Sequence, residues 1–398
     1  MIKLDRRKPI PILILSDCPS VQGGLSRVGR DLADLLVSMP EFRVGYLGRG
    51  GINRRTWSWM QYNYPESAQW GEEYIEHVWN DFSGGKDGII FSNWDLTRLL
   101  WFSQPRGTGP NLERFLGEGR NFQKWAYTPV DAAGPNGATL PALAAAAAAG
   151  FDRIAASSRW GCDVLQRSGR PDADWMPHGI WLDKFKRDDG AKAKLGWEGK
   201  VVLGCVMTNQ FRKDWGAAFE CAAAMKEHYG NRFHAWFHTD VPERYWSFPG
   251  LAADYGLGRD DMHVTVLLSD AQMALRYSGC DCTILPSRGE GFGFPIVESL
   301  ACGVPCIVTD HAAGPELVPE EYRVRPIGTH VDTPYNLRRA LVSGYAFAQS
   351  AAQAIRIVDE DPEFKRAELR DSVAHLDWPK LSVTWKKWFQ EGLGGLNG

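Results

Sequence analysis

Residues 285–305 read LPSRGEGFGFPIVESLACGVP, and this stretch is the most informative guide to the fold. The apolar residues before it, 281–285 (DCTIL), predict a buried strand that runs directly into a turn containing three glycines. Pro295 suits the first turn of a helix, and Gly303 followed by Pro305 suits its end. A strand, a glycine loop, a short helix and a second strand are typical of a parallel α/β sheet.

The chemistry of this turn indicates a ligand with two kinds of group. Backbone N–H groups of residues 291–294 stand at the predicted start of the helix, where phosphates bind well. Glu290 and Glu298 flank these groups; carboxylates repel phosphate but accept hydrogen bonds from sugar hydroxyls. The stretch therefore predicts a nucleotide sugar as ligand. The alternative is that Glu290 caps the loop and Glu298 is a solvated helix residue.

The same alternation of strands and helices extends in both directions along the chain. Apolar runs that predict strands occur at 10–15, 43–47, 88–92, 124–128 and 153–156, and again at 201–207, 233–238, 263–267 and 306–309. Residues 177–190 (PHGIWLDKFKRDDG) separate the two series and are interpreted as a linker. We predict two doubly wound α/β domains, 1–185 and 186–376, followed by a C-terminal helix within 377–398.

Composition excludes several classes of protein. The chain has 398 residues, 44% hydrophobic and 23% charged, which is ordinary for a folded protein rather than a disordered or fibrous one. A net charge of −3 excludes a strongly basic surface built only for nucleic acid. The 17 tryptophans exceed what two small cores need, so some are expected in clefts or on contact surfaces.

The N-terminal residues and the cysteines bear on location. MIKLDRRKPI followed by PILIL is interpreted as a first strand rather than a signal peptide, and no apolar run is long enough to span a bilayer. A cytoplasmic protein is therefore expected. The eight cysteines lack the usual spacing of a zinc site and are expected to be buried reduced thiols.

The pair Glu290 and Glu298, with GFGFPIV between them, resembles the signature of glycosyltransferase family 4. The resemblance implies the GT-B fold: two Rossmann-like domains facing a cleft, with a C-terminal helix that crosses back to the first domain. It further implies retaining transfer of a hexose from a nucleoside diphosphate sugar, UDP-sugar favoured, to a hydroxyl acceptor. Neither a metal nor a cofactor is implied.

The resemblance also assigns roles to donor-binding residues. It places Glu290 on the donor hexose and Glu298 on the ribose hydroxyls, and the backbone around Gly291, Phe292, Gly293 and Phe294 on sugar and phosphate. Arg212 and Lys213 would neutralise the diphosphate, although Met207 and Thr208 stand where the family often has an earlier arginine. Glu316 resembles a further donor-site element. Gly23 and Gly24 resemble the family's first glycine loop; an ordinary tight turn is the alternative.

The acceptor is expected on the first domain, where the sequence is less decisive. Asp131 stands near the place of a family histidine and would orient the acceptor hydroxyl or take its proton; capping a turn is the alternative. The segment 50–64 (GGINRRTWSWMQYNY), interpreted as a loop, interleaves Arg54 and Arg55 with Trp57 and Trp59. Its aromatic rings could form core, touch a lipid acceptor, or stack on bases.

Stacking on bases would make the protein a DNA glucosyltransferase acting on a hydroxymethylated pyrimidine. The acceptor classes that stay open are a glycan, a lipid, a small molecule and a modified DNA base. Two functions of another class also remain: a nucleotide-sugar epimerase of GT-B fold and an inactive sugar-binding protein.

Overall fold

The computed structural model describes residues 8–51, 56–104, 110–333 and 335–394. Tertiary contacts divide the chain into two compact units. Unit 1 contains the residues up to His178 and returns from Ser382 onward; unit 2 contains Gly179–Thr333 and Leu337–Leu381. The chain therefore passes from unit 1 to unit 2 and ends on unit 1.

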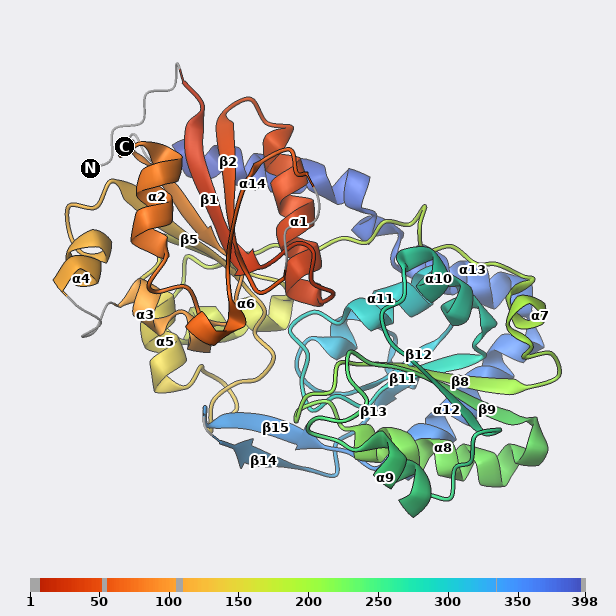
Figure 1. The fold of residues 1–398 in the computed structure, drawn as a ribbon. Helices are drawn as coiled ribbons and strands as arrows, with labels where there is room; N and C mark the ends of the chain where they lie inside the picture. The colour runs from red at the N-terminus through yellow and green to blue at the C-terminus, as the bar shows by residue number, and fades with distance from the viewer. Residues whose placement is uncertain (1–7, 52–55, 105–109, 334, 395–398) are drawn as a thin grey trace. The chain divides into compact units, whose positions relative to one another are not determined.

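Unit 1 is built on a seven-stranded parallel sheet with the order β3-β2-β1-β4-β5-β6-β7. Its strands and main helices in chain order are β1 (Ile10–Asp17), α1 (Gly24–Val37), β2 (Phe42–Arg49), β3 (Met60–Tyr64), α2 (Ile75–Ser83), β4 (Gly88–Ser92), α3 (Leu100–Ser103), α4 (Pro110–Leu116), β5 (Phe122–Thr128), α5 (Ala142–Ala149), β6 (Arg153–Ala156), α6 (Arg159–Arg167) and β7 (Asp174–Trp175). Figure 1 shows these elements in red to yellow.

Helices cover both faces of this sheet because its strands are apolar on both sides. One face carries Leu13 and Leu15 of β1, which share a core with residues of α2, α3 and α5. The opposite face receives α14 (Trp378–Gly394), drawn in blue in Figure 1. Aromatic rings of α14 pack on rings of β4 and β5: Trp385, Trp388 and Phe389 against Phe91, Trp125 and Tyr127.

Unit 2 repeats the architecture with a six-stranded parallel sheet, order β10-β9-β8-β11-β12-β13, and a separate antiparallel hairpin. Its elements are α7 (Ala191–Leu195), β8 (Val201–Val206), α8 (Trp215–Tyr229), β9 (Phe233–His238), α9 (Phe248–Asp254), β10 (Met262–Thr265), α10 (Asp270–Gly279), β11 (Cys282–Leu285), α11 (Phe294–Ala301), β12 (Cys306–Thr309), β13 (Arg323–Val324), the hairpin β14 (Gly328–Asp332) and β15 (Leu337–Leu341), α12 (Gly344–Glu360) and α13 (Pro362–Ser372).

The strand order of each sheet reverses once, and this reversal positions the sites described below. In unit 1 the chain moves outward from β1 to β2 and β3, then returns to add β4 on the other side of β1. In unit 2 the same reversal lies between β8 and β11. Open α/β sheets bind ligands at the carboxyl ends of the strands beside such a reversal.

The predicted fold class, two doubly wound α/β domains, is confirmed, but one local interpretation is wrong. Met60–Tyr64 is not loop: it forms β3, which pairs with β2 at the edge of the sheet. The segment 177–190, interpreted as a linker, does contain the boundary between the two units, after His178, although Ile180 and Phe185 are already buried in the core of unit 2.

The tryptophans are mostly core residues. Eleven of the 17 are buried, so most of the excess fills the two cores. All eight cysteines are free and buried, as the sequence predicts. None of the helices in the described ranges combines the length and apolar character needed to cross a bilayer.

Candidate functional site

The donor-binding residues expected in unit 2 lie on two loops at the carboxyl edge of its sheet. One loop follows β8 and carries Arg212 and Lys213; the other follows β11 and carries Glu290. The loops are joined by their backbones: Lys213 forms a β-bridge with Ser287, and the Arg288 N–H donates to the Arg212 carbonyl at 2.9 Å. Both loops stand at the reversal of strand order.

Glu290 is the centre of this cluster. Lys213 Nζ donates a hydrogen bond to Glu290 Oε1, and Arg212 Nη1 lies 3.6 Å from the same oxygen. Arg212 Nη1 also donates to the Gly289 carbonyl at 2.8 Å. The side chains of Lys213 and Glu290 are buried, so Lys213 is not a solvated surface cation.

The charges around Glu290 decide its protonation state. Burial by itself raises the pKa of a carboxyl, but Lys213 and Arg212 outweigh burial and hold the pKa of Glu290 below its usual value. The carboxylate is therefore ionised at neutral pH. A second ion pair supports the loops from outside the cluster, with Arg288 Nε 2.9 Å from Asp214 Oδ2.

The glycine loop ends in a backbone conformation that favours glycine. Gly293, which precedes the first residue of α11, has φ of 103°. A Cβ added there would stand 2.7 Å from Ile296 Cδ1. Gly291 and Phe292 before it are buried, while Phe294 is half-buried with its ring centroid 5.2 Å from that of Phe292.

Glu298 is buried on α11, which makes the interpretation of a solvated helix residue wrong. The Tyr277 hydroxyl of α10 donates a hydrogen bond to Glu298 Oε2 at 2.8 Å. Tyr277 is itself buried and rigidly placed. The sequence analysis missed Tyr277, and no local spacing could have indicated it because the contact joins two helices.

The remaining donor-site residues are placed as follows. Glu316 is exposed in a short 3₁₀ helix, Gly314–Leu317, beside the loop; the Ala313 N–H donates to the Glu290 carbonyl at 3.2 Å. Gly23 and Gly24 lie in unit 1 at the start of α1. Gly23 has an extended φ of 162°, and a Cβ there would meet only Ser26 Oγ at 3.6 Å. Neither backbone strain nor packing within the described residues requires glycine at 23.

The acceptor residues predicted in unit 1 lie on different elements, Asp131 after β5 and Trp57 and Trp59 just before β3. Asp131 is half-buried three residues after the end of β5. Trp59 is buried and stacks on both Trp57 and Tyr46, at centroid distances of 4.8 and 6.1 Å. This packing favours the interpretation of Trp59 as core. Arg54 and Arg55 lie outside the described residues.

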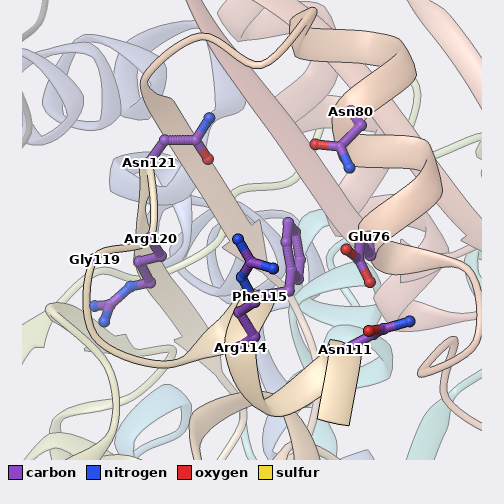
Figure 2. Close-up of a pocket in the computed structure, with 8 residues that line it drawn as sticks. All are labelled: Glu76, Asn80, Asn111, Arg114, Phe115, Gly119, Arg120 and Asn121. Atoms are coloured by element: carbon purple, nitrogen blue, oxygen red, sulfur yellow. The ribbon is translucent and has the colours of Figure 1, made fainter. Parts of the chain in front are cut away.

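A polar pocket of about 400 Å³ opens elsewhere on unit 1, between α2, α4 and the turn before β5 (Figure 2). It is lined by Glu76, Asn80, Asn111, Arg114, Phe115, Gly119, Arg120 and Asn121. Asn121 immediately precedes β5, so this pocket stands at the amino edge of the sheet. No predicted site residue lines it. Across the described part of the chain, no three His, Cys, Asp or Glu side chains are grouped to hold a metal.

Comparison with known proteins adds a family match in unit 2. The sequence model described as Glycosyl transferases group 1 matches residues 250–344, which include Glu290 and Glu298. The serotype-specific mannosyltransferase WbdA of Escherichia coli is 32% identical over 77 residues. That alignment covers 19% of this chain and 9% of WbdA, so the chain matches only a small part of that relative.

Solved structures match over nearly the whole chain. Sucrose-phosphate synthase from Thermosynechococcus elongatus superimposes with a TM-score of 0.72 at 17% identity, covering 97% of this chain and 100% of the other. Anabaena HepE, solved in complex with UDP-glucose, gives a TM-score of 0.68 at 14% identity, with coverage of 97% and 100%. At these identities the likeness concerns the fold.

Proposed function

The chain has the GT-B fold and carries a glycosyl transferases group 1 segment at residues 250–344, and from this premise we propose that it is a glycosyltransferase. The proposed reaction moves a hexose from a nucleoside diphosphate sugar to a hydroxyl acceptor. The observation that carries the proposal is the cluster of Arg212, Lys213 and Glu290 at the carboxyl edge of unit 2.

The positive side chains of this cluster match the negative charge of the donor's diphosphate. The diphosphate would bind Arg212 and Lys213, while Glu290 and Glu298 accept hydrogen bonds from the hexose and ribose hydroxyls. A Cβ added at Gly23 would meet only Ser26 Oγ, at 3.6 Å. The space around Gly23 therefore allows a phosphate to approach its backbone. A UDP-sugar is favoured, supported by the UDP-glucose complex of HepE; the name of WbdA supports a hexose as the transferred group.

The chemistry requires stabilisation of the leaving group. The bond between the anomeric carbon and the phosphate oxygen breaks, and negative charge grows on the nucleoside diphosphate. Lys213 and Arg212 are placed to neutralise that charge without a metal ion. The acceptor oxygen forms the new bond to the anomeric carbon and its proton is released; Asp131 is the proposed receiver. Retention at the anomeric carbon follows from the family resemblance.

A donor screen tests this proposal. Thermal unfolding of the protein is followed with UDP-, GDP- and ADP-sugars, and at least one should raise the Tm because a ligand of the folded state stabilises it. Glu290→Gln should abolish that shift. Glu198→Gln, at an exposed glutamate of the same unit, serves as control and should retain it. Binding of no sugar nucleotide would refute the proposal.

Product analysis separates the other functions. An epimerase would release an altered sugar nucleotide in the absence of acceptor, whereas an inactive sugar-binding protein would leave the donor intact. A DNA glucosyltransferase would label DNA containing hydroxymethylated pyrimidine. Transfer of the hexose to a hydroxyl of another acceptor, with release of nucleoside diphosphate, is the expected outcome.

A further inference from the structure

A buried asparagine ties the loop after β8 to the loop after β9. Asn209 is fully buried, three residues beyond the end of β8. Its backbone N–H donates to Asp240 Oδ1 at 2.6 Å, and its Nδ2 donates to the carbonyls of Val241 and Trp246 at 2.9 and 2.8 Å. Its Oδ1 accepts a hydrogen bond from the Trp246 N–H at 3.0 Å. Because both ends of the side-chain amide are engaged, Asn209 is fixed in one orientation.

Trp246 extends this connection to the turn that follows Asn209. Its indole Nε1 donates to the Gln210 carbonyl at 3.1 Å. The same carbonyl accepts the Lys213 N–H at 3.0 Å and so closes the turn 210–213. The half-buried Trp246 ring also lies against the start of α8, where a Cβ added at Gly216 would stand 3.3 Å from its Cζ3. Trp246 therefore contacts the loop at its turn and at the helix that follows.

The turn 210–213 presents the positive charges of the candidate donor site. It contains Arg212 and Lys213, and Arg288 on the adjoining loop adds a third cation, paired with Asp214. Like charges that lie close together repel one another. A loop that has to be ordered when its ligand arrives also weakens binding. A turn that is fixed in advance avoids this cost and keeps Arg212 and Lys213 together.

We propose that Asn209 and Trp246 are positioning residues, which hold the turn 210–213 so that Arg212 and Lys213 are preorganised for the donor diphosphate. This inference rests on the proposed glycosyltransferase function. The two residues act on the donor through the turn and not by contact with it. Weakening their hydrogen bonds should therefore weaken donor binding by more than a general loss of stability does.

Trp246→Phe tests the inference in the full-length protein, because it keeps a ring and removes the N–H that supports Gln210. The probe is the sugar nucleotide that raises the Tm most among UDP-glucose, UDP-galactose, GDP-mannose and ADP-glucose. Isothermal titration at 20 °C should give a Kd about 3- to 10-fold above that of wild type, as expected for one neutral hydrogen bond. An unchanged Kd would overturn the inference.

A double-mutant cycle shows whether Trp246 acts through the cations of the turn. Arg212→Met removes one of them at a half-buried position. If Trp246 serves to place these cations, Trp246→Phe should raise the Kd by a smaller factor in Arg212→Met than in wild type. A residue with a merely structural role would give the same factor in both backgrounds, and that result would overturn the inference.

Trp79→Phe is the matched control. Trp79 is a buried tryptophan of α2 in unit 1, and its Nε1 donates to Asn121 Oδ1 at 3.0 Å. This variant should lower the Tm but keep the wild-type Kd for the sugar nucleotide. An equal rise of Kd in Trp79→Phe and Trp246→Phe would mean that lost stability alone weakens binding, which would overturn the inference.

Asn209→Ala provides a second variant with a larger expected effect. It leaves two carbonyls and one N–H of the loop after β9 without their partner, so both the Tm and the donor affinity should fall. Circular dichroism confirms that the variant is folded at the temperature of the titration. Wild-type affinity in folded Asn209→Ala would overturn the inference alone, whereas a wild-type protein that binds no sugar nucleotide would overturn the proposed function as well.

Discussion

Buried carboxylates at the candidate donor site are held by neighbouring side chains. Glu290 is kept ionised by Lys213 and Arg212, and Glu298 accepts a hydrogen bond from Tyr277. Burying an ionised group without a partner costs free energy. The neighbours of these carboxylates therefore fix the orientation of each carboxylate. Since Tyr277 is fully buried and contacts Glu298 through its hydroxyl, we expect it to act on the donor only through Glu298, as a positioning residue.

Tyr277→Phe is expected to weaken donor binding. The ring stays in place and only the hydroxyl that orients Glu298 is lost, so KM for the donor should rise about tenfold with a smaller change in kcat. Steady-state kinetics with varied donor measure this. Tyr322→Phe, at another buried tyrosine of unit 2, should leave KM unchanged. An equal fall of kcat in both variants would contradict the positioning role.

At the residue scale, the sequence indicates candidates where spacing carries the information. The seven residues between Glu290 and Glu298 are visible in one short stretch. The contact of Tyr277 with Glu298 is not, because it joins two helices that are separate in the sequence.

At the scale of elements, the loop before α11 combines a strained backbone with the candidate donor site. Gly293 adopts a left-handed conformation that other residues enter at a cost, and its position leads the chain directly into α11. Gly23, before α1, has an extended backbone and little around it. The backbone strain at Gly293 therefore has no counterpart at Gly23.

Paired alanine substitutions separate these reasons. Gly293→Ala should lower the free energy of unfolding by about 1–3 kcal/mol because of backbone strain and the close Ile296 side chain. Gly23→Ala should change it little, but should weaken donor binding if a phosphate approaches this backbone. Urea denaturation and the donor-induced Tm shift measure the two effects. Equal losses of stability in the two variants would contradict this distinction.

His238 at the end of β9 predicts a pH dependence of stability. Burial, with a contribution from the positive charge of Arg276, lowers its pKa to about 4, and its Nδ1 lies 3.0 Å from Thr265 Oγ1. The unfolded chain, with a histidine pKa near 6.5, binds more protons between these values. Stability is therefore complete above about pH 6.5 and falls as pH drops toward 4, by up to about 3 kcal/mol.

Urea denaturation at several pH values measures this slope. His238→Asn, which keeps a polar side chain near Thr265 but does not titrate, should reduce the fall in stability between pH 6.5 and 4; the part that stays comes from groups such as His178, whose pKa burial also lowers. His375→Asn, at an exposed histidine, should retain the wild-type slope. The same slope in wild type and His238→Asn would show that other groups are responsible.

The sequence predicted correctly those strands that a short run of neighbouring residues defines. The central strands at 153–156, 233–238 and 306–309 match the structure residue for residue, because short apolar runs between turns define them. β3 was missed: as an edge strand with half-exposed alternate residues, it is defined by its pairing with β2. The hairpin of β14 and β15 was missed because β14 is largely polar and half-exposed, and Arg338 and Arg339 interrupt the apolar residues of β15.

On the scale of the whole molecule, the chain begins and ends on unit 1. Helix α14 fills one face of the unit 1 sheet with aromatic side chains. Trp385 is completely buried, meets Tyr127 edge to face, and donates its Nε1–H to the Pro177 carbonyl at 3.1 Å. Residues more than 200 positions apart thus share one core. Composition shows the high number of tryptophans but not this packing.

Trp385→Ala should destabilise the protein severely. Loss of a fully buried indole leaves a cavity and costs about 3–5 kcal/mol, and the Pro177 carbonyl loses its partner. Val383→Ala on the same helix, at a side chain that is 66% exposed, should cost little. Chemical denaturation followed by tryptophan fluorescence compares the two variants. Similar stabilities would mean that α14 contributes little to unit 1.

The eight buried cysteines have a practical consequence. Native protein should react slowly with a thiol reagent such as DTNB, since every sulfur is covered and burial raises the pKa of thiols such as Cys306, to about 12. Unit 1 carries two of them, Cys18 and Cys162, and unit 2 carries six. The number of thiols modified at each denaturant concentration would therefore report which unit opens first, without any added label.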